Sequence, residues 1–123
     1  MIKTKSVYDP VQESDGYRIL IMRKWPKGID YEKHSVYKWF KELAPSKELL
    51  DKWNTKKIKW ENYVKQYKRE QANSAAAKLA ADAIGVMSTE RIITLLCKER
   101  ENDPHCHRHI LKEIIDKKYK FPD

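Results

Sequence analysis

Three short apolar runs along the chain have the pattern of β-strands. They cover residues 2–8, 17–22 and 92–97, and an Asp15-Gly16 turn signal precedes the second run. The third run is apolar almost without interruption, as is typical of a strand covered on both faces in a parallel sheet. The pattern therefore predicts a small, mainly parallel sheet.

Between the second and third runs the apolar spacing changes to the helical period. Tyr37, Phe40 and Leu43 recur at this spacing, which predicts a helix. Pro45 ends that helix, and Ser46 is a suitable N-cap for the next one.

A longer helix is predicted around an aromatic and aliphatic stripe. It continues or kinks into residues 74–80 and stops at Gly85. An aromatic stripe at helical spacing is usually packing surface, so we assign it to the core rather than to a base-stacking platform. The stripe consists of Trp60, Tyr63, Val64 and Tyr67.

The last helix has the clearest start signal. We expect Asp103 to cap it and Pro104 to occupy its first turn, where a missing N–H group costs nothing. Its buried stripe is predicted to contain Ile110, Leu111, Ile114 and Ile115.

These elements predict a single α/β domain over residues 1–123, with a mainly parallel sheet flanked by helices in a Rossmann-like, three-layer arrangement. Three glycines and no low-complexity stretch argue against a linker or a repeat array. About eight residues separate the first two strands, fewer than a parallel crossover usually needs. A hairpin stays open as the alternative, and in it Asp9 would leave the site.

The net charge of +8 favours encounter with phosphate-bearing partners. Lysines that alternate with glutamates on helices are also typical of a solvated surface, so this signal has two interpretations. The first residues lack the apolar core of a leader, and no run approaches the roughly 20 apolar residues that span a bilayer. We expect a soluble, cytoplasmic protein without membrane contact, and the sequence leaves its oligomeric state open.

The reactive side chains gather near the end of the third strand. Ligands of open α/β sheets bind beyond the carboxyl ends of the strands, where this segment would lie. We expect reduced cysteines here, because no export signal accompanies them. The candidate catalytic residues are Cys97, Glu99, Cys106 and His107.

Cys106 is the candidate nucleophile, because the first turn of a helix stabilises an anion. His107 is its candidate base. The alternative is that Cys106 packs as a small apolar residue. Cys97 and Cys106 could also form a redox pair, although no Cys-x-x-Cys signature supports one.

Cysteines and histidines in one segment also suit zinc. The spacing argues against a metal site, because His105, His107 and His109 are i+2 neighbours and do not share one helix face. We therefore assign no metal ligands. The chain has no P-loop, no dinucleotide fingerprint, no Gly-x-Ser-x-Gly and no His-Glu-x-x-His, so we expect no cofactor.

Basic residues near the strand ends could bind a phosphate or a carboxylate, and arginine suits bidentate contact. Glu99 could orient an arginine, or it could form a structural ion pair with Arg23 or Arg108. The candidate ligand-binding residues are Asp9, Arg18, Arg23, Trp25, Lys27 and Arg108.

Several separated motifs, in order, resemble the family called domain of unknown function 488. The resemblance runs from about Lys5 to Ile115. It is carried by Tyr8-Asp9 and by residues 16–21, 23–28, 39–46, 95–99 and 106–108.

This resemblance implies a compact α/β domain with a mainly parallel sheet, and no established activity for the family as a whole. Met22 stands where an acidic residue commonly precedes the arginine, and Lys27 replaces a frequent arginine. The site residues that the resemblance implies are Tyr8, Asp9, Arg18, Arg23, Trp25, Pro26, Gly28, Lys41, Pro45, Ser46, Cys97, Glu99, Cys106, His107 and Arg108.

Our leading hypothesis is a strand-end pocket that binds a nucleotide, a nucleic-acid phosphate or another anion beside a thiol-containing site. Two alternatives remain: a non-catalytic module that binds nucleic acid through its basic surface, and a protein with thiol or metal redox chemistry. The sequence does not decide whether the chain is an enzyme.

Overall fold

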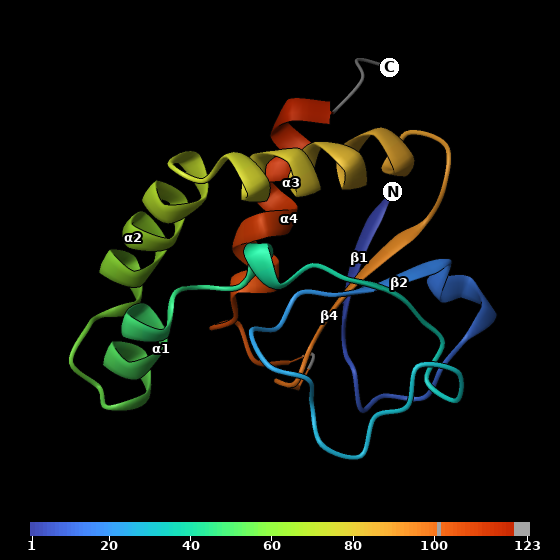
Figure 1. The fold of residues 1–123 in the computed structure, drawn as a ribbon, viewed down its shortest axis with the longest axis horizontal. Helices are drawn as coiled ribbons and strands as arrows, with labels where there is room; N and C mark the ends of the chain where they lie inside the picture. Colours follow the sequence, from blue (N-terminus) through green and yellow to red (C-terminus); the bar gives the residue numbers. More distant parts are fainter. Residues whose placement is uncertain (101, 120–123) are drawn as a thin grey trace.

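The computed structural model describes residues 1–100 and 102–119. Its centre is a sheet of four parallel strands in the order β1-β4-β2-β3 (Figure 1). The strands are β1 (Ile2–Ser6), β2 (Tyr17–Leu20), β3 (Val36–Trp39) and β4 (Ile93–Cys97). The predicted α/β class with a parallel sheet is confirmed.

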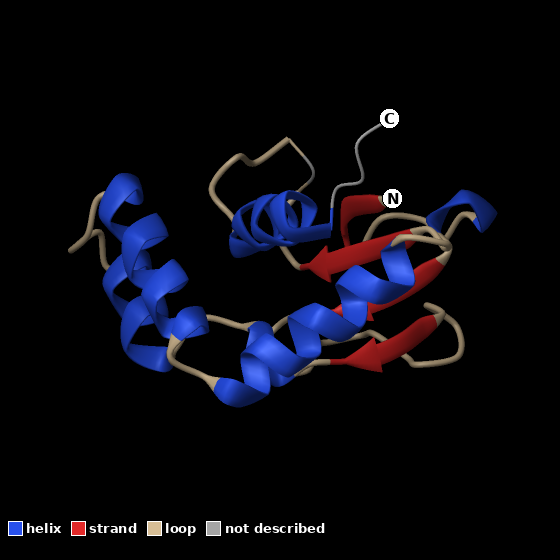
Figure 2. Cartoon of the chain, turned by 90° about the horizontal axis from the view of Figure 1, so that it is seen from above, coloured by secondary structure: helices blue, strands red, loops and turns tan. Residues whose placement is uncertain are grey.

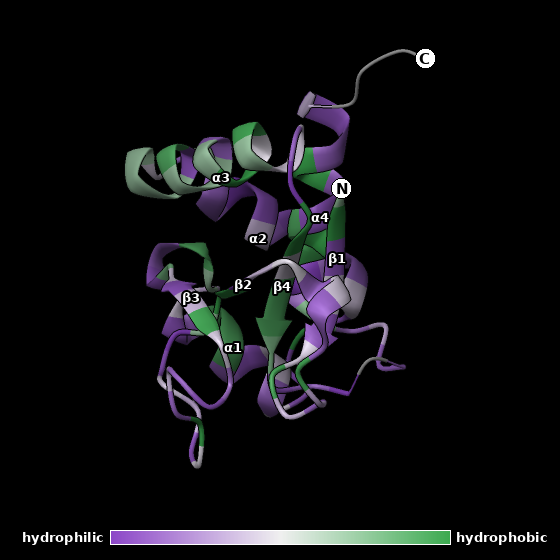
Figure 3. Cartoon of the chain, turned by 90° about the vertical axis from the view of Figure 1, so that its right-hand side faces the viewer, coloured by the Kyte–Doolittle hydropathy of each residue, from purple (hydrophilic) through white to green (hydrophobic). Residues whose placement is uncertain are grey.

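The most apolar strand, β4, lies inside the sheet, and all five of its residues are buried. Figure 3 shows β4 mostly in the hydrophobic colour. β1 and β2 pair with it in parallel on either side. The hairpin alternative is therefore wrong, because β4 separates β1 from β2.

Helices cover one face of this sheet. They are α1 (Lys47–Asn54), α2 (Trp60–Ala72), α3 (Ala75–Ser88) and α4 (His107–Tyr119), and Figure 2 shows α3 and α4 beside the strands. Ile19, Leu95 and Cys97 meet Tyr67 and Leu111 in the larger hydrophobic core. The aromatic stripe of α2 contributes to this core, as predicted.

Loops form the layer on the opposite face. Leu20 and Leu96 pack there with Val7, Ile29 and Val36, and no described residue of this smaller core belongs to an α-helix. Trp25 and Trp39 close its edge. The third layer of the fold is thus built from the turn after β1 and the loop between β2 and β3.

The predicted helix around Tyr37 is wrong. Residues Val36–Trp39 form β3, and Lys41–Leu43 form one turn of 3-10 helix. β-branched and aromatic residues favour a strand, and the free edge of β2 supplies its hydrogen bonds. Pro45 leaves too little chain after this strand for a stable α-helix.

Two helix ends also differ from the prediction. α3 passes through Gly85 and continues to Ser88, because this glycine lies directly under the ring of Tyr119. α4 begins at His107, whereas Asp103 accepts a hydrogen bond from the backbone N–H of His105 in the preceding turn. Cys106 therefore lies just before the first helical residue.

Within the described residues, no helix combines the length and the apolar character needed to cross a membrane.

Candidate functional site

Two cysteines and a histidine converge where β4 ends and α4 begins. Cys97 is the last residue of β4, and Cys106 and His107 lie at the start of α4. Both cysteines are free, and their sulfurs and a ring nitrogen of His107 all lie within 4.8 Å of one another. All three side chains are buried. The fold thus joins groups that the sequence separates by nine residues.

The surroundings of Cys106 favour its thiolate form. The Cys97 thiol donates a hydrogen bond to it, and this contact outweighs burial in lowering the pKa of Cys106 to about 3. The His107 ring, at 3.9 Å from its Sγ, and the backbone N–H of Arg108 act in the same direction. The sulfur therefore occupies an anion position at a helix N-terminus.

The pKa of Cys97 is shifted in the opposite direction. Complete burial raises the pKa of its thiol, and its hydrogen bond to Cys106 adds to that effect. The proton of the pair consequently stays on Cys97, and the negative charge stays on Cys106. Two residues of the same type thus have different chemical roles.

His107 is fixed by a backbone carbonyl. Its Nε2 donates to the oxygen of Ile21, at 2.6 Å, and also lies 3.5 Å from the Cys97 sulfur, whereas Nδ1 lies 3.9 Å from each of the two sulfurs. Burial alone would lower the pKa of His107, but the Cys106 thiolate and the Ile21 carbonyl raise it. These contacts favour the protonated form of the ring beside Cys106.

Glu99 contacts the same sulfur. Its Oε2 lies 3.3 Å from Cys106 Sγ. Burial raises the pKa of the Glu99 carboxyl, and the charge of Cys106 raises it further. The raised pKa favours the protonated form of this carboxyl, which can donate a hydrogen bond as well as accept one.

Arg108 holds the loop that carries these groups. Its guanidinium is fully buried and donates to the backbone oxygens of Glu99 and Arg100, each at 2.7 Å, and to that of Lys5 at 3.4 Å. These contacts involve the main chain of Glu99 and leave its carboxyl group facing Cys106. Arg108 thereby ties the loop after β4 to β1.

A cavity of about 260 Å³ opens over Cys106. Glu99, His105 and His107 line it from the loop and the start of α4, whereas Cys97 lies beneath it. Four cationic side chains border the cavity: Arg23, Lys24, Lys47 and Lys98. Arg23 and Cys106 thus share one cavity, which has a basic rim.

The sequence did not indicate the helical wall of this cavity. Lys47 and Trp53 come from α1, and Tyr63 comes from α2. The Trp53 ring lies 5.4 Å from that of His105 and 5.6 Å from that of Tyr63. The predicted aromatic stripe included Tyr63 as packing surface but made no prediction for Trp53, and no motif distinguishes the rings that also reach the cavity.

Four of the predicted ligand-binding residues lie elsewhere. Arg18 is buried, with Nη1 2.7 Å from Asp15 and Nε donating to the His34 carbonyl. Trp25 stacks on Tyr31 and packs against Trp39 at a separate hollow. Lys27 is exposed and Asp9 lies in the turn after β1, so neither lines the cavity over Cys106.

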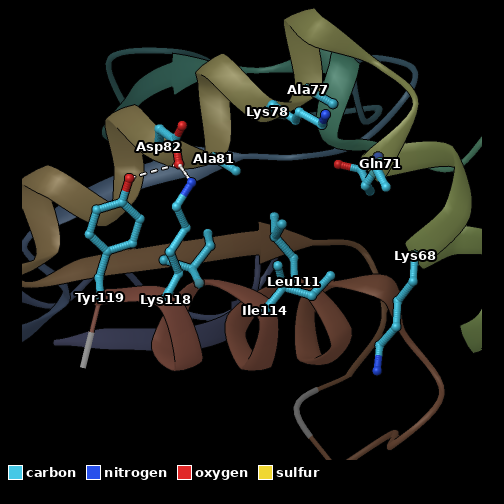
Figure 4. A pocket seen from close by; sticks show the side chains of 12 residues that line it. Lys68, Gln71, Ala77, Lys78, Ala81, Asp82, Leu111, Ile114, Lys118 and Tyr119 are labelled. Atoms are coloured by element: carbon cyan, nitrogen blue, oxygen red, sulfur yellow. Dashed lines mark hydrogen bonds and ion pairs between the residues drawn. The ribbon is translucent and has the colours of Figure 1, made fainter.

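A second hollow, of about 300 Å³, lies between α3 and α4 (Figure 4). Its floor is aliphatic, with Leu111 and Ile114. Asp82 accepts hydrogen bonds from both Lys118 and Tyr119, each at 2.7 Å, so its acid is already paired. None of the predicted site residues lines this hollow.

Cys97, Cys106 and His107 could also supply three ligand atoms to a metal ion. Sulfur and imidazole are donors that zinc accepts. The spacing of the histidines had argued against a metal, and only one histidine belongs to the cluster that the fold assembles. The buried sulfurs of the two cysteines complete this donor set.

Comparison with known proteins connects the chain to one family. A family model described as "Active DUF488-N3 subclade" matches residues 2–119. The uncharacterized protein YeaO of Escherichia coli K12 is 41% identical over 71 residues, which cover 58% of this chain and 62% of that protein. The uncharacterized protein Rv3073c of Mycobacterium tuberculosis H37Rv is 33% identical over 75 residues, which cover 61% of this chain and 64% of that protein.

The matched region therefore spans less than two thirds of the length of these relatives. No solved structure matches the chain.

Proposed function

The chain belongs to the DUF488 family, within the subclade described as active, and we propose that it uses Cys106 to act on a phosphate-bearing ligand held in the cavity. The observation that carries this proposal is the buried sulfur of Cys106, which lines a cavity with a cationic rim just before the first residue of α4. A nucleotide or a nucleic-acid phosphate is the ligand class that this combination favours. We assign the chemistry to a reducing compartment such as the cytoplasm, where both thiols persist.

In this proposal the rim binds the charge of the ligand. Arg23, Lys47 and Lys98 approach the cavity from different segments, so a phosphate between them would meet several cations. Arginine can donate two parallel hydrogen bonds to phosphate oxygens, which orients the group as well as binding it. Arg23 is therefore the principal phosphate contact.

The floor of the cavity supplies the reactive group. Cys106 is the nucleophile, and the His107 imidazolium stabilises its charge and can give a proton to a leaving group. The Glu99 carboxyl lies beside the same sulfur and can donate a hydrogen bond to the ligand. Arg108 is a positioning residue, since it holds the loop through backbone oxygens.

Isothermal titration with nucleoside monophosphates and a short single-stranded oligonucleotide tests the proposal. Arg23→Ala removes a charge-assisted contact of about 1.5–3 kcal/mol. The variant should therefore bind the phosphate compound at least tenfold more weakly than the wild type. Lys27→Ala is the matched control, because it removes one exposed positive charge outside the cavity. Its affinity should stay close to that of the wild type.

Two results would overturn the proposal. One is that no phosphate compound binds the wild-type protein. The other is that Lys27→Ala and Arg23→Ala weaken binding equally and with the same steep dependence on salt, which indicates a diffuse basic surface.

A further inference from the structure

Cys97 has no role in binding a ligand at the rim, yet its thiol is directed at the reactive sulfur. It is fully buried at the end of β4 and does not line the cavity. Its sulfur lies within 4.8 Å of the Cys106 sulfur, and both are free. A buried thiol in this position can react with Cys106 and with little else.

Access to the two sulfurs is unequal. Cys106 lines the cavity of about 260 Å³, so a small reagent can reach it, whereas Cys97 lies behind it. The titratable residues around the sulfurs include Glu99 from the loop, His107 from α4, and Tyr63 and Tyr67 from α2. Cys106 must consequently react first.

We propose that Cys97 and Cys106 form a two-cysteine centre that reduces hydroperoxides, in which Cys106 is the attacking sulfur and Cys97 is the resolving sulfur. The inference shares with the proposed function only the assignment of Cys106 as the reactive sulfur. It requires no phosphate ligand. A hydroperoxide is small and neutral, so it can enter the cavity that Cys106 lines without a cationic contact.

The first step oxidises Cys106. Its thiolate attacks one oxygen of the hydroperoxide, an S–O bond forms and the O–O bond breaks. The departing alkoxide or hydroxide takes a proton from the His107 imidazolium, whose Nδ1 lies 3.9 Å from the sulfur. Cys106 becomes a sulfenic acid, and the peroxide is reduced to an alcohol or to water.

The second step joins the two cysteines. The Cys97 sulfur attacks the Cys106 sulfur, an S–S bond forms, and the S–O bond breaks. The leaving hydroxide takes the Cys97 proton and departs as water. A dithiol reductant then returns both thiols by exchange at the disulfide. Cys97 belongs to β4, whereas Cys106 lies in the loop before α4. Closing the S–S bond therefore requires movement mainly of the Cys106 side chain.

Intact-mass measurement tests this inference on chelator-treated protein, exposed to one equivalent of hydrogen peroxide without any phosphate compound. Dimedone is added to trap any sulfenic acid. The wild type should form the disulfide, with the loss of two hydrogens, and should give no dimedone adduct. Cys97→Ser should instead accumulate a dimedone adduct at Cys106, because nothing resolves the sulfenic acid. Cys106→Ser should form neither product and should consume peroxide no faster than buffer.

The outcome that overturns the inference is a dimedone adduct on the wild type without a disulfide, or oxidation of Cys106 no faster than that of free cysteine. A stoichiometric metal that withstands the chelator and blocks oxidation would also overturn it. Circular dichroism checks that each variant is folded, and Cys97→Ala serves as a second variant if the serine disturbs the core. This test measures mass and peroxide consumption, whereas the proposed function is tested by titration with nucleotides. Either proposal can therefore fail without affecting the other.

Discussion

At the scale of single residues, position decides the chemistry of two identical side chains. Burial raises the pKa of Cys97, whereas a thiol donor, His107 and a helix N-terminus lower that of Cys106 despite burial. Cysteine reactivity follows the thiolate, so we expect the two sulfurs to differ in reactivity. Composition alone cannot distinguish them.

The alkylation rate of Cys106 should be almost independent of pH between about 5 and 8. With a pKa of about 3, its thiolate is fully formed throughout this range, whereas free cysteine, with a pKa of about 8.5, gains thiolate as the pH rises. Rates with iodoacetamide, measured by mass spectrometry on chelator-treated protein, check this expectation.

Cys97→Ala removes the main donor to the Cys106 thiolate and should restore a rise of rate with pH. Cys97→Ser retains a hydroxyl donor at the same position, so the rise of its alkylation rate with pH should be smaller. A wild-type rate that climbs tenfold per pH unit, as for a free thiol, would contradict the thiolate assignment.

Arg108 should be far more sensitive to substitution than a neighbouring surface arginine. Arg108→Lys cannot reproduce the forked donation to the Glu99 and Arg100 carbonyls, and we expect a loss of about 1.5–3 kcal/mol in unfolding free energy. Arg100→Lys, at an exposed side chain, is the control and should change little. Urea denaturation measures both, and equal effects would show that the forked contact is unimportant.

At the scale of elements, α3 and α4 approach each other through a glycine. A Cβ atom at Gly85 would lie 2.2 Å from the ring of Tyr119, so the close contact of the two helices requires that no side chain be present. This explains why a residue of low helix propensity lies inside α3. The helix continues there because tertiary contact outweighs the local preference.

Gly85→Ala should lower the melting temperature, although alanine favours an isolated helix by about 1 kcal/mol. The new methyl group must displace the Tyr119 ring from its hydrogen bond with Asp82. In a Tyr119→Ala background the same substitution should raise the melting temperature, because the obstacle is gone. A stabilising effect in the wild-type background would refute this packing argument.

At the scale of the whole molecule, one buried carboxylate connects separate segments of the sheet layer. Asp15 accepts hydrogen bonds from Lys5 of β1 and Arg18 of β2, and its backbone oxygen accepts one from Thr94 of β4. Burial tends to raise the pKa of Asp15, but the Gln12 N–H, Lys5 and Arg18 together lower it. The carboxylate therefore stabilises the folded state while it is ionised.

Asp15→Asn should reduce the unfolding free energy by about 3–5 kcal/mol at pH 7, because Arg18 would remain as a buried charge. The folded pKa is lowered, so this contribution is complete above the unfolded value near 3.9 and is lost as the pH falls through the folded value. The difference in melting temperature between wild type and variant should thus shrink below about pH 4. Asp103→Asn, at a half-buried turn residue, is the control.

Local patterns correctly predicted much of the fold. The continuous apolar run at Ile93–Cys97 predicted a buried parallel strand, and Ser46 predicted the start of α1, where its hydroxyl accepts from the Leu49 N–H. The same reasoning failed at Val36–Trp39, where an apolar spacing near the helical period hid a strand. This short segment forms a strand because the edge of β2 offers it backbone hydrogen bonds, and β2 is distant from it in the sequence.

The sequence by itself determined that the two cysteines and their neighbouring histidines flank a strand-to-helix connection, because strand and helix signals depend on near neighbours along the chain. Only the tertiary structure decided that Lys47 and Trp53 of α1 border the same cavity as Arg23, and that Arg18 and Arg108 are buried within the protein framework. Distances and burial arise from packing between remote segments, and these set the charge state of Cys106.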